Sequence, residues 1–273
     1  MSLVKTALSA FALLASFQAI GFCNDKNHDE TDKAIASYSR SIQLNPKDAK
    51  ARNNRGTMYA VKGLLKDALQ DFSDAIASDP SYGDAYYNRA KLEEEFGKLD
   101  EALADYSKSI GLDPLNSSAF YNRGLLRKAK GLTEDAITDF SMVTNLEPKS
   151  PEAFYNLGEL KYSKGDAEGA MAAFTRAVQA NPKFADAYRA RSRVKLEKGD
   201  ATGANEDATR AVLLEKGLDR DSLVRGDYGR PFKMPAIDLT IKPPKIEDFG
   251  PPPSQQKTQR LNNALTDFLK NSK

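Results

Sequence analysis

Five columns of residues recur every 34 positions along this chain of 273 residues. A column here means the residues that occupy the same place in successive repeats. The proline column is Pro46, Pro80, Pro114, Pro148 and Pro182. The glycine column is Gly63, Gly97, Gly131, Gly165 and Gly199. The alanine column is Ala68, Ala102, Ala136, Ala170 and Ala204. The aromatic column is Tyr38, Phe72, Tyr106, Phe140 and Phe174. The small-residue column is Gly56, Ala90, Gly124, Gly158 and Ser192. A fixed period of this size indicates a solenoid, in which each repeat buries its apolar face against its neighbours.

Each repeat predicts two helices joined by a short turn. In residues 81–114, apolar and small residues at helical spacing indicate a first helix that ends at Gly97 and a second helix that ends before Pro114. Glycine adopts the left-handed conformation that ends helices, and proline disfavours helix in the residue before it. We therefore predict an all-α fold with five full repeats, at 47–80, 81–114, 115–148, 149–182 and 183–216.

These residues resemble those of the tetratricopeptide repeat family. The segments 86–90, 120–124 and 154–158 are similar to the first-helix signature of the family, and Ala136, Phe140 and Pro148 are similar to its second-helix signature. The resemblance covers residues 47–216 and departs from the family pattern mainly at the two ends, at Arg52, Ala208 and Lys216. It implies a right-handed superhelical solenoid of helix-turn-helix units. The first helices would line a concave groove that binds a protein or a peptide.

The N-terminal residues 1–21 are typical of a signal peptide or a membrane anchor. Lys5 precedes an apolar stretch that runs to Asn24, and the small residues Ala19 and Gly21 predict cleavage after Gly21. The stretch also approaches the roughly 17 residues that a spanning helix needs, so an uncleaved anchor is an alternative. A lipid attached to Cys23 is a further alternative, although Phe22 stands where that signal requires a small residue.

Residues 22–46 predict a linker followed by half a repeat. Ala34, Tyr38 and Pro46 match the second helix of a repeat, but Phe22 and Asp29 occupy the small-residue and glycine columns of the first helix. This broken register favours an export signal over an additional first helix. We expect an exported protein in a periplasm or cell envelope, with anchoring to a membrane there and secretion as the alternatives.

The predicted peptide-binding groove is lined by two columns of the first helices. The first is Asn54, Asn88, Asn122 and Asn156, and the second is Tyr87, Tyr121 and Tyr155. A carboxamide has both donors and an acceptor, which suits an extended peptide backbone. The alternative is that these asparagines satisfy local polar groups of the fold. The two-carboxylate clamp of some family members is excluded, because its Lys/Arg pair is missing.

A third column on the first helices contains Arg55, Arg89, Arg123 and Arg191. We expect their aliphatic stems to pack along the helix and their guanidinium groups to be solvated. A stripe that binds an anionic ligand is the alternative.

The C-terminal tail has a different composition. Seven of the thirteen prolines lie between Pro231 and Pro253, which predicts an extended linker at 217–254. Residues 255–273 predict a short amphipathic helix with one apolar face made of Leu261, Leu265, Phe268 and Leu269. This helix, at 257–270, is expected to cap the last repeat, where Leu213 and Leu214 otherwise lack a cover. Occupation of its own groove and recruitment of a partner are the alternatives.

The sequence offers no chemistry for catalysis. It has one cysteine and one histidine, and it lacks phosphate-binding loops and nucleophile elbows. A net charge of +2 is too even for a typical nucleic-acid binder. We expect no enzyme, no cofactor, no metal and no nucleic-acid partner. The predicted function is a scaffold that binds proteins or peptides in bacterial envelope or periplasmic assembly. The alternative is a membrane-anchored or lipidated accessory subunit of an envelope complex.

Overall fold

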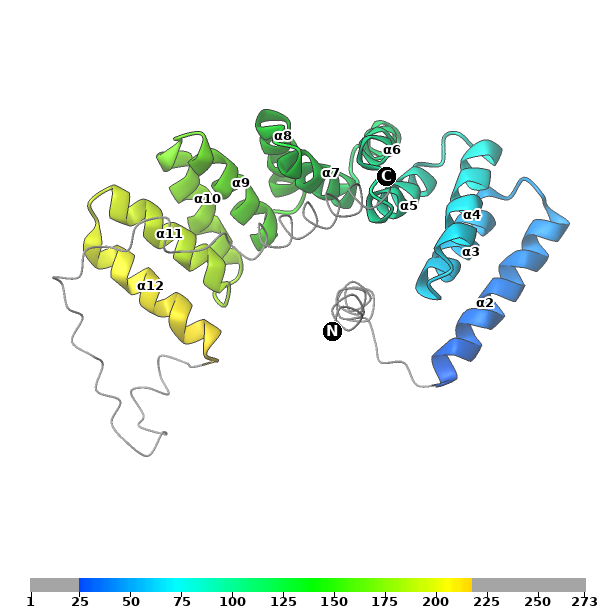
Figure 1. Cartoon of the computed structure of the whole chain (residues 1–273), viewed down its shortest axis with the longest axis horizontal. Coiled ribbons are helices and arrows are strands. Elements are labelled where there is room, and N and C mark those ends of the chain that lie inside the picture. Colours follow the sequence, from blue (N-terminus) through cyan, green and yellow to red (C-terminus); the bar gives the residue numbers. More distant parts are fainter. Residues whose placement is uncertain (1–24, 218–273) are drawn as a thin grey trace, which may run out of the picture. The chain divides into compact units, whose positions relative to one another are not determined.

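The computed structural model describes residues 25–217, which contain eleven α-helices and no strand (Figure 1). The predicted signal or anchor at 1–21, Cys23, the Pro-rich segment from 218 and the predicted C-terminal helix at 255–273 lie outside the described residues. The chain consists of two compact units, one up to Ala119 and the other from Phe120. We call them unit 1 and unit 2 and describe each by itself.

Unit 1 contains one helix without a hairpin partner, two helix pairs and the first residues of α7. Its helices are α2 (Asp25–Leu44), α3 (Ala49–Val61), α4 (Leu65–Ser78), α5 (Gly83–Glu95) and α6 (Leu99–Leu112). Helix α7 (Ser117–Ala129) continues into unit 2, which also contains α8 (Thr133–Leu146), α9 (Pro151–Ser163), α10 (Ala167–Ala180), α11 (Ala185–Glu197) and α12 (Ala201–Glu215). The first helices of the repeats are α3, α5, α7, α9 and α11, and each is followed by a second helix.

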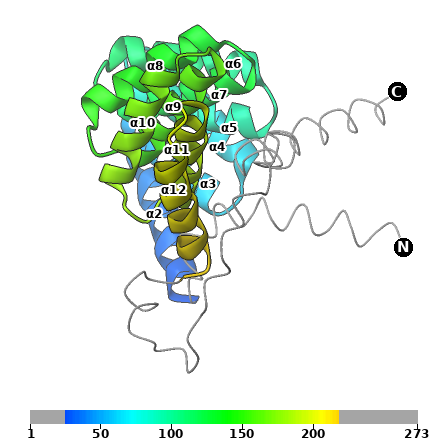
Figure 2. The same ribbon diagram turned by 90° about the vertical axis from the view of Figure 1, so that its left-hand side faces the viewer.

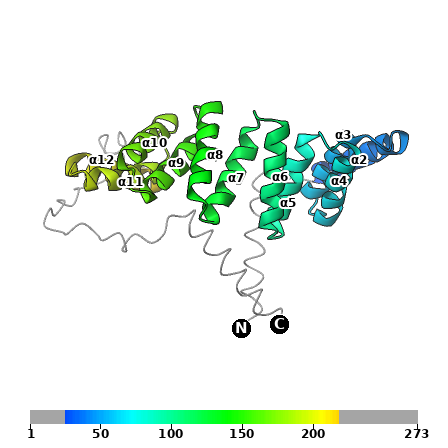
Figure 3. The same ribbon diagram turned by 90° about the horizontal axis from the view of Figure 1, so that it is seen from above.

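The turns form where the repeat predicts them. The glycines between the two helices of each repeat have a left-handed backbone, with φ between 74° and 82°. The residue before each proline leaves the helix, as at Asp79 and Asp113, whose backbones are extended. These stops produce the helix pairs α5–α6 (Figure 3) and α11–α12 (Figure 2). The second helices α4, α8 and α10 also pack against the first helices that follow them. The predicted all-α helix-turn-helix solenoid is therefore confirmed.

A small residue of the first helix packs against an aromatic ring of the second helix. A Cβ atom added to Gly56 would lie 2.8 Å from the Phe72 ring, and one added to Gly158 would lie 2.6 Å from the Phe174 ring. Both rings are almost completely buried, at 2% and 1% exposure. The small-residue and aromatic columns thus set the close approach of the two helices.

Helix α2 replaces the first pair of the array. Its counterpart α4 begins at Leu65, so the 34-residue register predicts a start at residue 31, yet α2 begins at Asp25 and runs through the position of the expected turn. It packs against α3, and Lys62 pairs with its Asp32. Tyr38 is only half-buried, whereas Phe72 in the same column is buried. Within the described residues, α2 has no first helix of its own.

An arginine of the first helix and an aspartate of the second helix form a bidentate ion pair in four of the five repeats. We call this pair the helix-pair clasp. Both nitrogen–oxygen contacts of each clasp lie between 2.6 and 3.1 Å. The pairs are Arg55–Asp71, Arg89–Asp105, Arg123–Asp139 and Arg191–Asp207. The expectation of solvated guanidinium groups is wrong, because each group binds a buried carboxylate inside its own repeat.

The repeat at 149–182 replaces both partners of the clasp with apolar residues. Leu157 stands in the arginine column and Ala173 in the aspartate column. Both are buried, and they belong to one apolar cluster with Leu160 and Phe140. A buried ion pair and an apolar pair of suitable shape can stabilise a fold to a similar extent, because charge desolvation offsets the attraction of the ions.

We expect a double-mutant cycle on the first clasp to show strong coupling. Asp71→Ala leaves Arg55 without its carboxylate and should cost about 3 kcal/mol, whereas Arg55→Leu together with Asp71→Ala imitates the repeat at 149–182 and should recover most of that loss. Denaturant unfolding of the full chain measures both. If the double variant lost as much unfolding free energy as the two single variants together, the assignment of the clasp would be contradicted.

The residue one helical turn after the clasp arginine adds a positive or a negative charge beside the clasp. Arg127 and Lys195 occupy this place in two repeats and bind the clasp aspartate at 2.7 and 3.0 Å. In the repeat at 81–114 the place is taken by Glu93, which lies 3.9 Å from Arg89 and has a buried Oε2 atom without a hydrogen-bond partner among the described residues. Desolvation, helped by the charge of Asp105, raises the pKa of Glu93 to about 7.

Unit 1 should therefore lose stability as the pH rises. Between pH 4.5 and about 7 the folded chain holds a proton on Glu93 that the unfolded chain has released. Glu93→Lys removes this liability and imitates Lys195, so it should stabilise unit 1 by about 1–3 kcal/mol at pH 8 and by less at pH 5. Thermal unfolding at both pH values measures the effect, with the exposed Glu206→Lys as the charge-matched control. If both variants changed the melting temperature equally, or if the effect of Glu93→Lys were the same at both pH values, the destabilising role of Glu93 would be refuted.

Candidate functional site

Within each unit, first helices of neighbouring repeats lie beside one another. Helix α3 contacts α5 in unit 1, and α9 contacts α11 in unit 2, in addition to the contacts with their second helices. We call the exposed and half-buried side chains of the first helices, taken within each unit, the first-helix face. It includes Asn54, Thr57, Tyr87, Asn88 and Lys91 in unit 1, and Tyr121, Asn122, Lys128, Glu159, Tyr162, Ser163 and Arg193 in unit 2.

The asparagine column makes hydrogen bonds between repeats. Asn88 donates to Oδ1 of Asn53 at 2.9 Å, and Asn156 donates to the hydroxyl of Tyr121 at 3.5 Å. In both cases the acceptor belongs to the preceding repeat, where it stands one position before that repeat's own residue of the asparagine column. At Asn88 and Asn156 the carboxamide thus satisfies a polar group of the fold, as in the alternative interpretation.

Asn156 departs furthest from its expected place in the groove. Only 6% of its surface is exposed, and its carboxamide also donates to the carbonyl oxygen of Glu152 at 2.9 Å. Its Oδ1 atom accepts a hydrogen bond from Lys128 at 2.9 Å. Asn54, Asn88 and Asn122 are half-buried. The four positions are therefore not equivalent, because Asn156 is buried and the other three are not.

The residues of the tyrosine column also differ in burial. Tyr87 is half-buried, and its ring lies 6.0 Å from that of Tyr106 and 5.8 Å from Nζ of Lys91. Tyr121 is half-buried beside Phe140, with 5.6 Å between the ring centres. Tyr155 is buried at 7% exposure between the rings of Phe174 and Phe184, so it belongs to the core of unit 2.

A charged cluster on α7, α9 and α11 was missed by the sequence analysis. Glu159 lies close enough to Lys128 and Arg193 for their charges to interact. Its Oε1 atom is buried and has no hydrogen-bond partner among the described residues. Arg193 lies over the ring of Tyr162 at 5.6 Å, and the hydroxyl of Tyr162 binds Glu197. We call the three charged residues the Lys128–Glu159–Arg193 triplet.

Burial dominates the electrostatics of this triplet. It lowers the pKa of Lys128, against the attraction of Glu159. It raises the pKa of Glu159, although Lys128 and Arg193 both act in the opposite direction. One sequence signal for the cluster exists: Thr57, Lys91, Leu125, Glu159 and Arg193 form one column in which the residue type changes from repeat to repeat.

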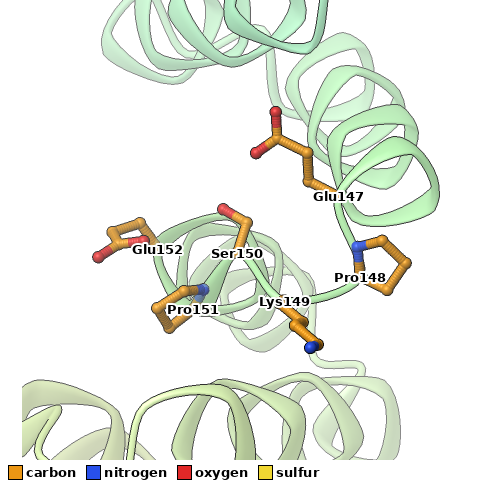
Figure 4. Close-up of a pocket in the computed structure, with 6 residues that line it drawn as sticks. All are labelled: Glu147, Pro148, Lys149, Ser150, Pro151 and Glu152. Atoms are coloured by element: carbon orange, nitrogen blue, oxygen red, sulfur yellow. The ribbon is translucent and has the colours of Figure 1, made fainter.

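A shallow hollow at the turn between α8 and α9 does not form a comparable site. It is lined by six consecutive residues, Glu147 to Glu152. Figure 4 shows that the side chains of Glu147, Lys149 and Glu152 point in different directions, so no polar groups converge on a ligand position.

Two other kinds of site find no support in residues 25–217. That part of the chain has no group of three or more His, Cys, Asp and Glu side chains suited to a metal ion. None of its helices combines the length and the apolar character that crossing a bilayer requires.

Comparisons with known proteins agree with this architecture. A family model described as tetratricopeptide repeat matches residues 26–83, 65–117, 87–151, 121–185 and 155–221. No curated protein matches the sequence.

Solved structures share the fold. YrrB, described as a TPR protein with an unusual peptide-binding site, is 21% identical with a TM-score of 0.60, over 66% of this chain and 92% of its own. PilF from Pseudomonas aeruginosa is 19% identical with a TM-score of 0.60, over 70% and 87%. MamA from Desulfovibrio magneticus RS-1 is 20% identical with a TM-score of 0.56, over 63% and 97%. The repeat columns, the helix pairs and these matches agree, and the chain belongs to the tetratricopeptide repeat family.

Proposed function

We propose that this protein is a scaffold that binds protein or peptide partners on its first-helix face. The observation that carries the proposal is that α3 contacts α5 and α9 contacts α11, so that within each unit charged, aromatic and carboxamide groups of different repeats come close together. Such a surface offers the mixed polar and apolar contacts that an extended peptide needs. YrrB, which has the same fold, is described as having a peptide-binding site, and this favours the same class of partner.

The proposed scaffold has no catalytic activity of its own. Members of the tetratricopeptide repeat family are typically non-enzymatic interaction proteins. In residues 25–217 the ionisable groups of the clasps are paired within the repeats, which leaves them to hold helices together.

We propose an exported location, in bacterial envelope or periplasmic assembly. The support is the basic residue, the apolar stretch and the small residues at 1–21. A membrane-anchored or lipidated accessory subunit is the second candidate, because the same stretch approaches membrane-spanning length and Cys23 follows it. Mass spectrometry of the mature N-terminus distinguishes them: a start near Phe22, a lipid on Cys23, or a retained Met1.

We also propose that the tail segment 257–270 covers the last repeat. Val212 of α12 is 46% exposed, whereas Val178 occupies the same column of α10 and is 6% exposed beneath the next repeat. Leu213 and Leu214 are half-buried, so Val212 marks the uncovered surface more clearly than they do. The apolar residues of the tail segment, Leu261, Leu265, Phe268 and Leu269, suit this role.

Truncation after Gly217 should lower the stability of the chain. Loss of the cover exposes apolar surface of α12 and should reduce the melting temperature by about 4–8 °C, which corresponds to roughly 2 kcal/mol in a chain of this size. Removal of residues 271–273 alone is the control. If the longer truncation melts like the full chain, the capping role is refuted.

Peptide selection tests the proposed binding face. Random dodecapeptides displayed on phage are selected on the purified full chain, and affinities are measured with synthetic peptides. Thr57→Arg and Ser163→Arg place a bulky charge on first helices, and Ser107→Arg and Thr138→Arg place it on second helices. All four hydroxyls bond a carbonyl of their own helix, so the substitutions are matched locally.

At least one first-helix variant should weaken the selected peptides about tenfold or more, and the second-helix variants should leave affinity within about twofold. Sensitivity confined to the second helices would contradict the proposal. Failure to select any peptide would contradict the peptide class of partner.

A further inference from the structure

We infer that the Lys128–Glu159–Arg193 triplet of unit 2 binds the main chain of the partner peptide. In this arrangement Glu159 accepts a hydrogen bond from a peptide N–H group, and Lys128 and Arg193 donate to a peptide carbonyl group. The inference rests on the proposed peptide-binding function and assigns the contact to three residues outside the asparagine column.

The buried oxygen of Glu159 is the first observation. Its Oε1 atom lacks a hydrogen-bond partner among the described residues although it is shielded from solvent. Leaving a buried acceptor unsatisfied is costly, and native folds rarely do so without a reason. The fold does not require a carboxylate here, because Thr57 and Leu125 stand in the same column. The Glu159 side chain as a whole is half-buried, so a turn of its carboxylate would bring this oxygen to a ligand N–H group.

The two cations supply the opposite hydrogen-bonding capacity. Lys128 uses one of its three N–H donors on Asn156. Arg193 lies over Tyr162, and it has no salt bridge with the described residues. Both side chains therefore keep donors for a ligand oxygen. Asn156 is a positioning residue in this scheme, because it is itself held by Glu152 and Tyr121 and fixes the amine of Lys128.

A neutral peptide unit fits the triplet better than an ion does. An anion bound by Lys128 and Arg193 would be repelled by Glu159, and a cation bound by Glu159 would be repelled by its two neighbours. A peptide main chain carries a donor and an acceptor without net charge. In an extended chain the N–H and C=O groups of one residue point to the same side, so a single residue can satisfy both kinds of partner.

The peptides obtained by selection test this inference by calorimetric titration of the full chain. Glu159→Gln and Lys128→Met should each weaken binding about tenfold, because each removes a charge-assisted hydrogen bond. Lys164→Met and Glu134→Gln are the controls, since these residues form an exposed ion pair of the same unit at 2.8 Å. They should change affinity by less than about twofold.

A scan of N-methylated peptides separates main-chain contacts from side-chain contacts without altering the protein. One N-methyl position should abolish most of the affinity for the wild-type chain, and the same position should have a smaller effect on Glu159→Gln, whose amide oxygen accepts a weaker, uncharged hydrogen bond. Circular dichroism confirms folding of each variant, and Glu159→Leu should melt at a higher temperature than wild type, because it removes a buried unsatisfied carboxylate.

Two results overturn the inference while the proposed function stands: selected peptides that bind Glu159→Gln and Lys128→Met like wild type, or N-methyl effects that are equal in wild type and Glu159→Gln. Failure to select any peptide overturns the inference together with the peptide-binding function.

Discussion

The close approach of two helices within each repeat is the constraint on which the structure depends. A residue such as Gly56 or Gly158 leaves no room for a larger side chain beneath Phe72 or Phe174. This contact brings each hairpin together, but one hairpin cannot bury its remaining apolar surface alone. Within each unit a second helix therefore packs against the next first helix, and first helices come to lie side by side. The candidate binding face is a consequence of this packing.

The interior of each repeat is completed by charge as well as by apolar contact. The helix-pair clasp joins the two helices in four repeats, and the repeat at 149–182 achieves the same closure with Leu157 and Ala173. A clasp in its own repeat occupies the guanidinium groups that an anionic ligand would need. The groups that remain for recognition are those whose polar atoms the fold leaves unsatisfied, above all Glu159.

Much of this fold follows from the sequence, because its signals are local and repeated. Proline, glycine and the small and aromatic columns fix where helices end and which faces meet, so the helix pairs could be predicted. The clasps could not, although Asp71, Asp105, Asp139 and Asp207 also keep the 34-residue step. An aspartate on a helix is usually solvated, and only the packing of the two helices shows that Arg55 reaches Asp71.

The candidate site was predicted less well, because it too depends on how the helices pack together. Recurrence identified Asn156 and Tyr155, but residues that recur are mainly those that the architecture itself requires, and both are buried. Lys128, Glu159 and Arg193 do not recur, and their relation depends on which helices become neighbours. A crystal structure of the full chain with a selected peptide tests the proposed binding on the first helices most directly. We expect a peptide along α7, α9 and α11, with a main-chain N–H group at Glu159. A peptide bound to α8, α10 and α12, or one that leaves Glu159 without a hydrogen bond, would contradict it.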